Sequence, residues 1–211
     1  MIHLKHEFRA VLRPQVLLVL ALSTLSSVAL FCVFTYVAPI LETVTRVSPR
    51  AVTYVLVVFG VGITVGNLVG GRLSDWRQMP TILGGQTLLI VIFVLMPLTM
   101  PYAVGVSAMI FVWGLVHFGA GAPLQSRIVD QAKGAPNLAS TLNQGAFNLG
   151  NAMGASLGGL VLMAGYPYQR LPLASAGVCG VALIVGIVAA RTERNSLRRS
   201  ARDAAVRPAG M

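Results

Sequence analysis

The chain has 211 residues, of which 55% are hydrophobic and only 10% are charged, and its mean hydropathy is +0.77. A water-soluble domain carries about 25% charged residues, so this composition excludes an ordinary water-facing surface and favours a lipid-facing one. The 16 Lys and Arg residues outnumber the 6 Asp and Glu residues. They lie between apolar segments and at the two ends, which argues against a nucleic-acid-binding protein.

Long apolar segments fill most of the chain. Five stretches contain no Asp, Glu, Lys or Arg: residues 14–41, 51–71, 78–126, 134–169 and 171–190. A helix needs about 20 residues to cross the hydrocarbon core, and the third stretch is long enough for two crossings. Pro97 and Pro101 divide it, because two prolines four residues apart break a helix. The sequence therefore predicts an all-α integral membrane protein with six transmembrane helices, near residues 14–38, 51–74, 79–97, 102–124, 138–162 and 171–190.

Basic residues are unevenly divided between the two sides of this scheme. With both termini in the cytoplasm, only Arg46, Arg50 and Arg170 lie outside. The positive-inside rule therefore predicts a multi-pass protein of the cytoplasmic (plasma or inner) membrane with both termini cytoplasmic. The predicted organisation is a cytoplasmic segment (1–13), a transmembrane domain (14–190) and a basic, disordered cytoplasmic tail (191–211) resting on the anionic membrane surface. The first apolar stretch is too long for a cleaved signal peptide.

Three markers recur at similar offsets in the two halves of the chain. They are the glycine stripes Gly62, Gly66, Gly70 and Gly150, Gly154, Gly158, the pair Pro39 and Pro123, and the pair Pro80 and Pro172. Two copies of a three-helix unit have opposite orientations in the membrane, as in the inverted repeats of secondary transporters. Each glycine stripe also lets another helix approach closely, either within the six-helix unit or across a surface with a partner.

The sequence around residues 66–77, GNLVGGRLSDWR, resembles the loop signature G-x-L-[AS]-D-R of the major facilitator superfamily, in the form found in the second half of these transporters. Gly71, Leu73, Ser74 and Asp75 match, whereas Trp76 stands where the family often has Arg. Residues 139–155 resemble the eleventh helix of the drug:proton antiporter and sugar-efflux branch, and residues 34–41 resemble the end of its seventh helix. The chain is thus similar to helices 7–12 of a twelve-helix transporter whose N-terminal half is missing.

This resemblance implies roles for particular residues. The first helix of each triplet lines the substrate cavity in the family, and a polar face of the 138–162 helix adds amides. The candidate cavity residues are Ser27, Phe31, Thr35, Trp113, His117, Asn143 and Asn148. His117 is the only ionisable side chain deep in any span, which favours a function, although a neutral histidine bonded between helices is the alternative. The hydroxyls, aromatics and amides have a similar alternative in helix packing.

Two further expectations follow from the resemblance. The helices near 51–74 and 138–162 would face the other half, which favours an inter-half surface for the glycine stripes. A cytoplasmic charge network would latch one state of the transporter, because contacts made in one state only bias the equilibrium towards it. The candidate latch residues are Gly71, Arg72, Asp75, Arg77, Arg127 and Asp130. Arg127 and Asp130 would pair with the loop or with each other; a plain topogenic loop is the alternative.

Three functions remain open from the sequence. The first is half of a secondary transporter that exports a small organic compound by alternating access, with the proton as coupling ion and a missing N-terminal half as partner. The second is a homodimer of two copies, and the third is a membrane scaffold or fragment without transport. An enzyme is not expected, because no nucleophile–base arrangement is visible. Cys32 and Cys179 lie inside apolar spans, and no cofactor or metal site is predicted.

Overall fold

The computed structural model describes residues 12–132 and 135–206, and within these ranges the chain is helical without strands. The elements in chain order are α2 (Pro14–Phe34), α3 (Val37–Thr43), α4 (Pro49–Thr99), α5 (Ala103–Gln131), α6 (Pro136–Met163), the 3-10 helix η1 (Tyr168–Arg170) and α7 (Leu171–Val206). Prolines stand in the first turn of α2, α4 and α6, where the missing N–H has no helical partner to lose. The Ser48 hydroxyl caps α4 by accepting from the Ala51 N–H at 3.3 Å.

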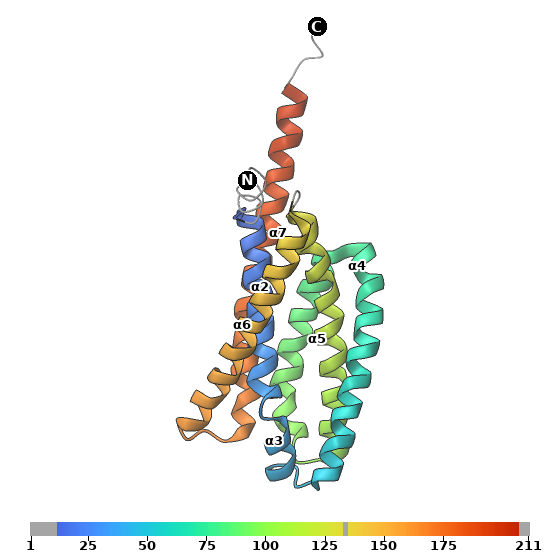
Figure 1. Cartoon of the computed structure of the whole chain (residues 1–211), viewed down its shortest axis with the longest axis vertical. Coiled ribbons are helices and arrows are strands. Elements are labelled where there is room, and N and C mark those ends of the chain that lie inside the picture. Colours follow the sequence, from blue (N-terminus) through green and yellow to red (C-terminus); the bar gives the residue numbers. More distant parts are fainter. Residues whose placement is uncertain (1–11, 133–134, 207–211) are drawn as a thin grey trace.

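Five helices in the described part are long and apolar enough to cross a membrane: Pro14–Thr43, Pro49–Thr99, Ala103–Gln131, Pro136–Met163 and Tyr168–Ser196. The predicted number was six, and the difference lies in α4. Where the sequence predicts spans near 51–74 and 79–97, the structure has one 51-residue helix with a break at Arg77, whose backbone is extended (φ −153°, ψ 90°). Residues 49–76 form its first arm and 78–99 its second arm, and the two run in opposite directions (Figure 1).

Proline explains both interruptions of helical backbone. Pro80 has no N–H to donate to the Trp76 carbonyl one turn earlier, and its ring clashes there, so the helix breaks between them. Pro39 has the same effect on the Thr35 carbonyl, so α2 ends at Phe34 and α3 begins at Val37. The predicted first helix, 14–38, therefore contains an interruption at residues 35–36, while the apolar span as a whole continues to Thr43.

The tail prediction was wrong for the residues that the structure describes. α7 continues through the predicted boundary at 190 to Val206, as an extension that projects from the bundle (Figure 1). The stretch after residue 190 contains Ala, Arg, Glu and Leu, which are strong helix formers, and its first proline is Pro208. Most of the predicted cytoplasmic segment 1–13, and residues 207–211, lie outside the described residues.

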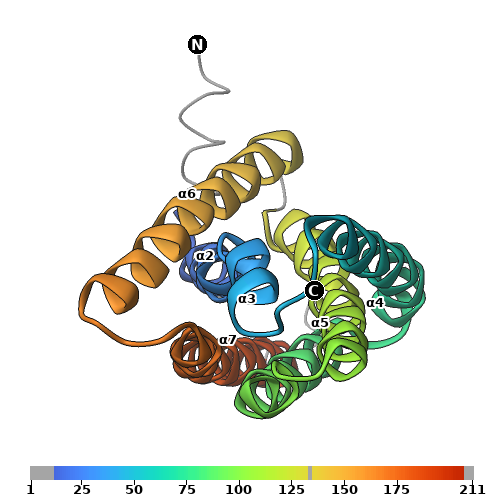
Figure 2. The same ribbon diagram turned by 90° about the horizontal axis from the view of Figure 1, so that it is seen from below.

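Two pairs of helices form the most extensive contacts, α4 with α5 and α2 with α6. Seen along the bundle, α2 lies in the middle, α6 crosses it on one side, α7 lies on the other, and α4 and α5 close the remaining side (Figure 2). The start of α2, the Arg77 break, the end of α5 and the residues after 190 lie at the same end of the bundle (Figure 1). We call this the basic end.

The glycine stripes form the closest helix contacts inside the chain. A Cβ at Gly62 would lie 2.5 Å from the Phe111 carbonyl oxygen of α5, and a Cβ at Gly154 would lie 2.5 Å from the Val28 carbonyl oxygen of α2. At Gly66, Gly70 and Gly150 an added Cβ would lie 2.3–2.5 Å from a carbonyl oxygen of α5 or α2, and at Gly158 it would lie 2.8 Å from the Cys32 carbonyl oxygen of α2. The expectation that these stripes face a missing half is therefore wrong: they hold α4 to α5 and α6 to α2, because only glycine permits such close backbone approach.

Candidate functional site

The apolar interior is divided into two clusters. The larger one contains Phe59, Phe93 and Trp113, and the smaller one, towards the basic end, contains Leu22 and Ile128. Between them lies a layer of buried polar side chains: Ser23, Ser26, Ser27, Gln86, His117 and Asn143. Burying such groups away from water costs free energy unless each finds a hydrogen-bond partner. A polar layer inside an apolar bundle is therefore a candidate functional site.

A cavity of about 290 Å³ opens into this polar layer. Four helices, α2, α4, α5 and α6, supply its walls. The lining residues are Ser23, Ser26, Gln86, Leu89, His117, Phe118, Ala120, Gly121, Leu124, Gln125, Asn143, Gln144 and Phe147. This described lining carries no Asp, Glu, Lys or Arg, so the cavity combines neutral hydrogen-bonding groups with apolar walls, as in a site for a small uncharged molecule.

Four buried polar atoms in the cavity lining have no hydrogen-bond partner among the described residues. They are Ser23 Oγ, Gln86 Oε1, His117 Nδ1 and Asn143 Oδ1. These atoms come from four different helices, so they surround the cavity rather than forming a single face. An unpaired buried polar atom costs about 1–3 kcal/mol, and a bound ligand or water with matching groups would recover that free energy.

Neighbouring groups hold the amides in the lining. The Gln86 Nε2 amide donates to Ser26 Oγ at 2.5 Å, which links α4 to α2. Asn143 Nδ2 donates to Gln125 Oε1 at 2.6 Å, and Gln125 Nε2 donates to Ser140 Oγ at 2.8 Å, which links α5 to α6. Each held amide, Gln86 and Asn143, keeps its carbonyl oxygen unpaired. The cavity is thus supplied with oriented acceptors.

Two of the seven candidate cavity residues, His117 and Asn143, line this cavity, and the other five do not. Ser27 is fully buried and bonds to α6 through the Phe147 carbonyl (2.9 Å) and the Asn151 side chain. Trp113 is also fully buried. It packs within a cluster of aromatic rings, those of Phe34, Phe59 and Phe93. The spacing of four that places Trp113 beside His117 on one helix face does not reveal that aromatic rings cover the tryptophan.

The remaining candidates lie away from the cavity. Phe31 packs edge-on against Phe34 and Phe147. The exposed Thr35 donates its hydroxyl to the Phe31 carbonyl of its own helix at 2.7 Å. Asn148 is exposed on α6. A role for any of them would depend on a surface outside this chain.

Sequence reasoning missed several polar residues of the lining, above all Gln86, Ser23, Ser26 and Gln125. Gln86 gave a usable signal, because it is the only amide in the predicted 79–97 span. The two serines gave none, since hydroxyls are common in membrane helices. The partner of Ser26 lies on another helix, and Ser23 Oγ has no partner among the described residues.

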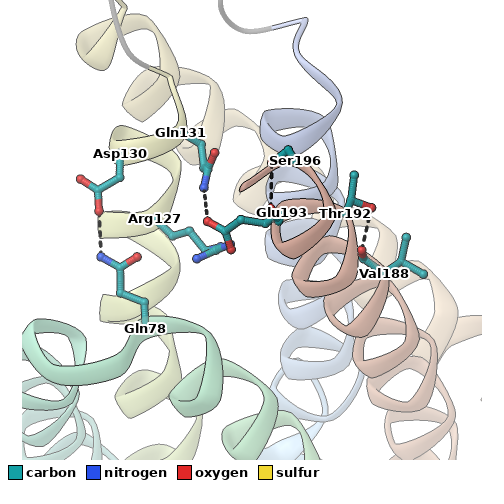
Figure 3. Close-up of polar contacts among 8 residues, drawn as sticks. All are labelled: Gln78, Arg127, Asp130, Gln131, Val188, Thr192, Glu193 and Ser196. Atoms are coloured by element: carbon teal, nitrogen blue, oxygen red, sulfur yellow. Dashed lines mark hydrogen bonds and ion pairs between the residues drawn. The ribbon is translucent and has the colours of Figure 1, made fainter. Parts of the chain in front are cut away.

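The basic end carries a separate polar network (Figure 3). Arg127 of α5 is 5% exposed and forms an ion pair of 2.5 Å with Glu193 of α7, the only ion pair in the described part of the chain. Gln131 Nε2 donates to the same carboxylate at 2.9 Å. Gln78, directly after the break in α4, donates to Asp130 Oδ2 at 2.8 Å. This network therefore ties α4, α5 and α7 together.

Only two of the candidate latch residues, Arg127 and Asp130, take part in this network. Asp130 pairs with the loop region through Gln78, whereas Arg127 pairs with Glu193, a partner that the sequence did not suggest. Arg72 and Asp75 are exposed and belong to no ion pair among the described residues. Arg77 lies over the Trp76 ring, 5.6 Å from its centroid. Gly71 has open space around its Cα.

The fold and the cavity define the class: an all-helical, multi-pass membrane protein with a polar site in its interior. No protein-family model matches the chain. It is 40% identical over 189 residues to the inner membrane transport protein YdhP of Escherichia coli K12, a match over 90% of this chain and 49% of YdhP.

Two further relatives are more distant. A chloramphenicol resistance protein of Streptomyces lividans is 32% identical over 184 residues, which cover 86% of this chain and 46% of that protein. The uncharacterized MFS-type transporter YfhI of Bacillus subtilis 168 is 27% identical over 194 residues, with coverages of 92% and 49%. The chain belongs to the major facilitator superfamily of membrane transporters, and it spans about half the length of the curated relatives it matches.

Proposed function

We propose that the chain is the C-terminal half of a twelve-helix secondary transporter and that its cavity forms part of the path of a small, uncharged organic compound. The observation that carries this proposal is the set of four unpaired buried polar atoms from four helices around one cavity. A purely structural bundle gains nothing from leaving them unpaired, whereas a transporter must hold and then release its substrate. The match to about half of each relative supports a half-protein.

The proposed mechanism is alternating access, in which two six-helix halves rock about the substrate. In this scheme each arm of α4 crosses the bilayer, which gives six spans in two inverted three-helix repeats. The missing N-terminal half would cover α6, which is the least buried of the five apolar helices and exposes Leu149, Met153 and Leu160. Both termini, and with them the basic end, would face the cytoplasm of the inner membrane, in agreement with the positive-inside rule.

We also propose efflux driven by proton exchange. The Streptomyces relative is named a chloramphenicol resistance protein, and chloramphenicol, a small organic molecule without charge, is therefore a suitable probe for a cavity without charged residues. His117 is the titratable group in the cavity lining. Within the described residues, the membrane-spanning part of this chain contains no buried Asp or Glu that would carry a proton. A proton carrier would therefore be His117 or a residue of the other half.

A chimera tests the proposal. In it, this chain replaces the matching 189-residue segment of YdhP. Efflux of radiolabelled chloramphenicol from loaded cells is compared for the chimera, the chain alone and the remainder of YdhP alone. The half-transporter proposal expects efflux only from the chimera, abolished by a protonophore. Efflux from the chain alone would instead support the homodimer. Absence of efflux from all three proteins would support a membrane fragment without transport.

Paired substitutions then test the cavity itself. Gln86→Leu removes a lining amide, whereas Thr87→Val changes the adjacent exposed residue, whose hydroxyl donates only to the Leu83 carbonyl of its own helix at 2.9 Å. A lost substrate hydrogen bond of about 1 kcal/mol corresponds to roughly a fivefold weaker apparent affinity. We expect this loss for Gln86→Leu and for Asn143→Leu but not for Thr87→Val. Equal effects of Gln86→Leu and Thr87→Val would contradict a role for the cavity.

The homodimer is the second candidate function. The glycine stripes are already occupied by α5 and α2, so a dimer would have to use other surfaces, such as the exposed apolar face of α6. A disulfide cross-link between two copies carrying Leu149→Cys, in a protein whose native cysteines are replaced, would support this dimer. A monomer in mild detergent with no cross-link would exclude it.

A further inference from the structure

A groove of about 530 Å³ lies between α4 and α7 at the basic end. Its apolar floor consists of Met79, Pro80 and Leu83 of α4 and Ile187 of α7. Arg191 and Arg194 of α7 form its rim. The groove therefore has an apolar part and a cationic part side by side.

The groove lies at the depth where a membrane helix leaves the hydrocarbon. The charge-free stretch of α7 ends at Ala190, and Arg191 is the first charged residue after it. One turn before Ala190 the two helices come close together, because a Cβ at Gly186 would lie 2.8 Å from Leu83 Cδ2. A molecule in the groove would thus have one end against apolar side chains and the other end at the level of lipid headgroups.

The positive charge at the rim is not neutralised within the described chain. Arg191 and Arg194 are both exposed, stand three residues apart on one helix face, and have no ion-pair partner among the described residues. Glu193 also lines the groove, but its carboxylate accepts from Arg127 at 2.5 Å and from Gln131 at 2.9 Å. Glu193, the one acidic residue in the described lining of the groove, is therefore already paired, and the two arginines leave the groove with a net positive charge.

We propose that this groove binds an anionic phospholipid of the cytoplasmic leaflet. Its phosphate lies between the guanidinium groups of Arg191 and Arg194, and one acyl chain covers Pro80, Leu83 and Ile187. Guanidinium groups bind phosphate oxygens with directed, charge-assisted hydrogen bonds, and the apolar floor requires a hydrocarbon chain rather than a free phosphate. Binding at this groove requires neither transport nor a second half of the protein.

Native mass spectrometry of the purified full chain tests the proposal. The chain in detergent is incubated with equal amounts of palmitoyl-oleoyl phosphatidylglycerol and palmitoyl-oleoyl phosphatidylcholine. After the detergent is removed by collisional activation in the gas phase, the masses of the protein–lipid complexes show which lipid is retained and how many molecules of it. We expect retention of one phosphatidylglycerol in preference to phosphatidylcholine. Arg191→Gln with Arg194→Gln should weaken phosphatidylglycerol binding by about fivefold for each arginine.

The matched control is Arg50→Gln with Arg170→Gln, which removes the same charge from exposed arginines at the opposite end of the chain's helices. This control should keep the wild-type lipid preference, and the charge-conserving variant Arg191→Lys with Arg194→Lys should retain most of it. Circular dichroism of every variant shows whether it is folded. Equal retention of the two lipids by the wild type would overturn the proposal. So would equal losses in the groove variant and the control, or displacement of the lipid by millimolar glycerol 3-phosphate.

Discussion

Substitution of Gly154 by alanine should separate α6 from α2. The new Cβ would lie 2.5 Å from the Val28 carbonyl oxygen and 3.0 Å from both the Cys32 backbone nitrogen and Phe31 Cβ. Two of these three atoms belong to the backbone of a helix and cannot move aside without shifting that helix. Overpacking of this kind costs roughly 1–3 kcal/mol. Gly145→Ala on the same helix is the matched control, because no atom lies within 4 Å of its added Cβ.

The free energy of unfolding of both variants can be measured by titrating the purified chain in mild detergent with sodium dodecyl sulfate and following helicity. Alanine has a better helix propensity than glycine by up to about 1 kcal/mol, so Gly145→Ala should leave stability unchanged or raise it slightly. Both variants gain the same helix propensity, so their free energies of unfolding should differ by the overpacking cost alone, roughly 1–3 kcal/mol. Equal stability of the two, or a more stable Gly154→Ala protein, would refute the packing of α6 on α2 described above.

Two further predictions concern tryptophan exposure and the ion pair at the basic end. Because Trp113 is fully buried and Trp76 is 76% exposed, acrylamide should quench the fluorescence of a Trp113→Phe protein strongly and that of a Trp76→Phe protein weakly; equal quenching would contradict the aromatic cluster. In a double-mutant cycle of Arg127→Leu and Glu193→Leu, each single change should destabilise the chain, and the double change should cost less than their sum by about 1–2 kcal/mol. Additive effects on unfolding would show that the pair makes no net contribution.

The sequence predicted the helical class and the approximate position of the apolar segments well, because a helix in lipid must satisfy all its backbone groups internally and therefore needs a long uncharged run. It also placed the family correctly. What it could not supply was the partner of each residue. The glycine stripes were visible in the sequence, yet only the structure shows that they contact α5 and α2.

The same limit explains the mixed outcome for the candidate site. Helical spacing reveals which residues share a face, and it named His117 and Asn143, which line the cavity, but it does not show which other helix covers that face. For this reason it did not show that aromatic rings cover Trp113, which does not line the cavity. The partner of Arg127 lies 66 positions away on another helix, in a segment that composition alone predicted to be disordered. Long-range pairing of this kind leaves no trace in a single sequence.

The break in α4 has a consequence for biogenesis. Only Arg77 departs from helical geometry between the two arms, so the arms are joined by a turn with almost no slack. If each arm crosses the bilayer, as proposed above, then one arm cannot reverse its orientation during insertion while the other keeps its own. Arg72 and Arg77 sit at the turn, so their retention on the cytoplasmic side would orient both arms at once. α4 would then enter the bilayer as a single hairpin. A change of charge at its turn would either reverse the orientation of both arms together or leave both unchanged.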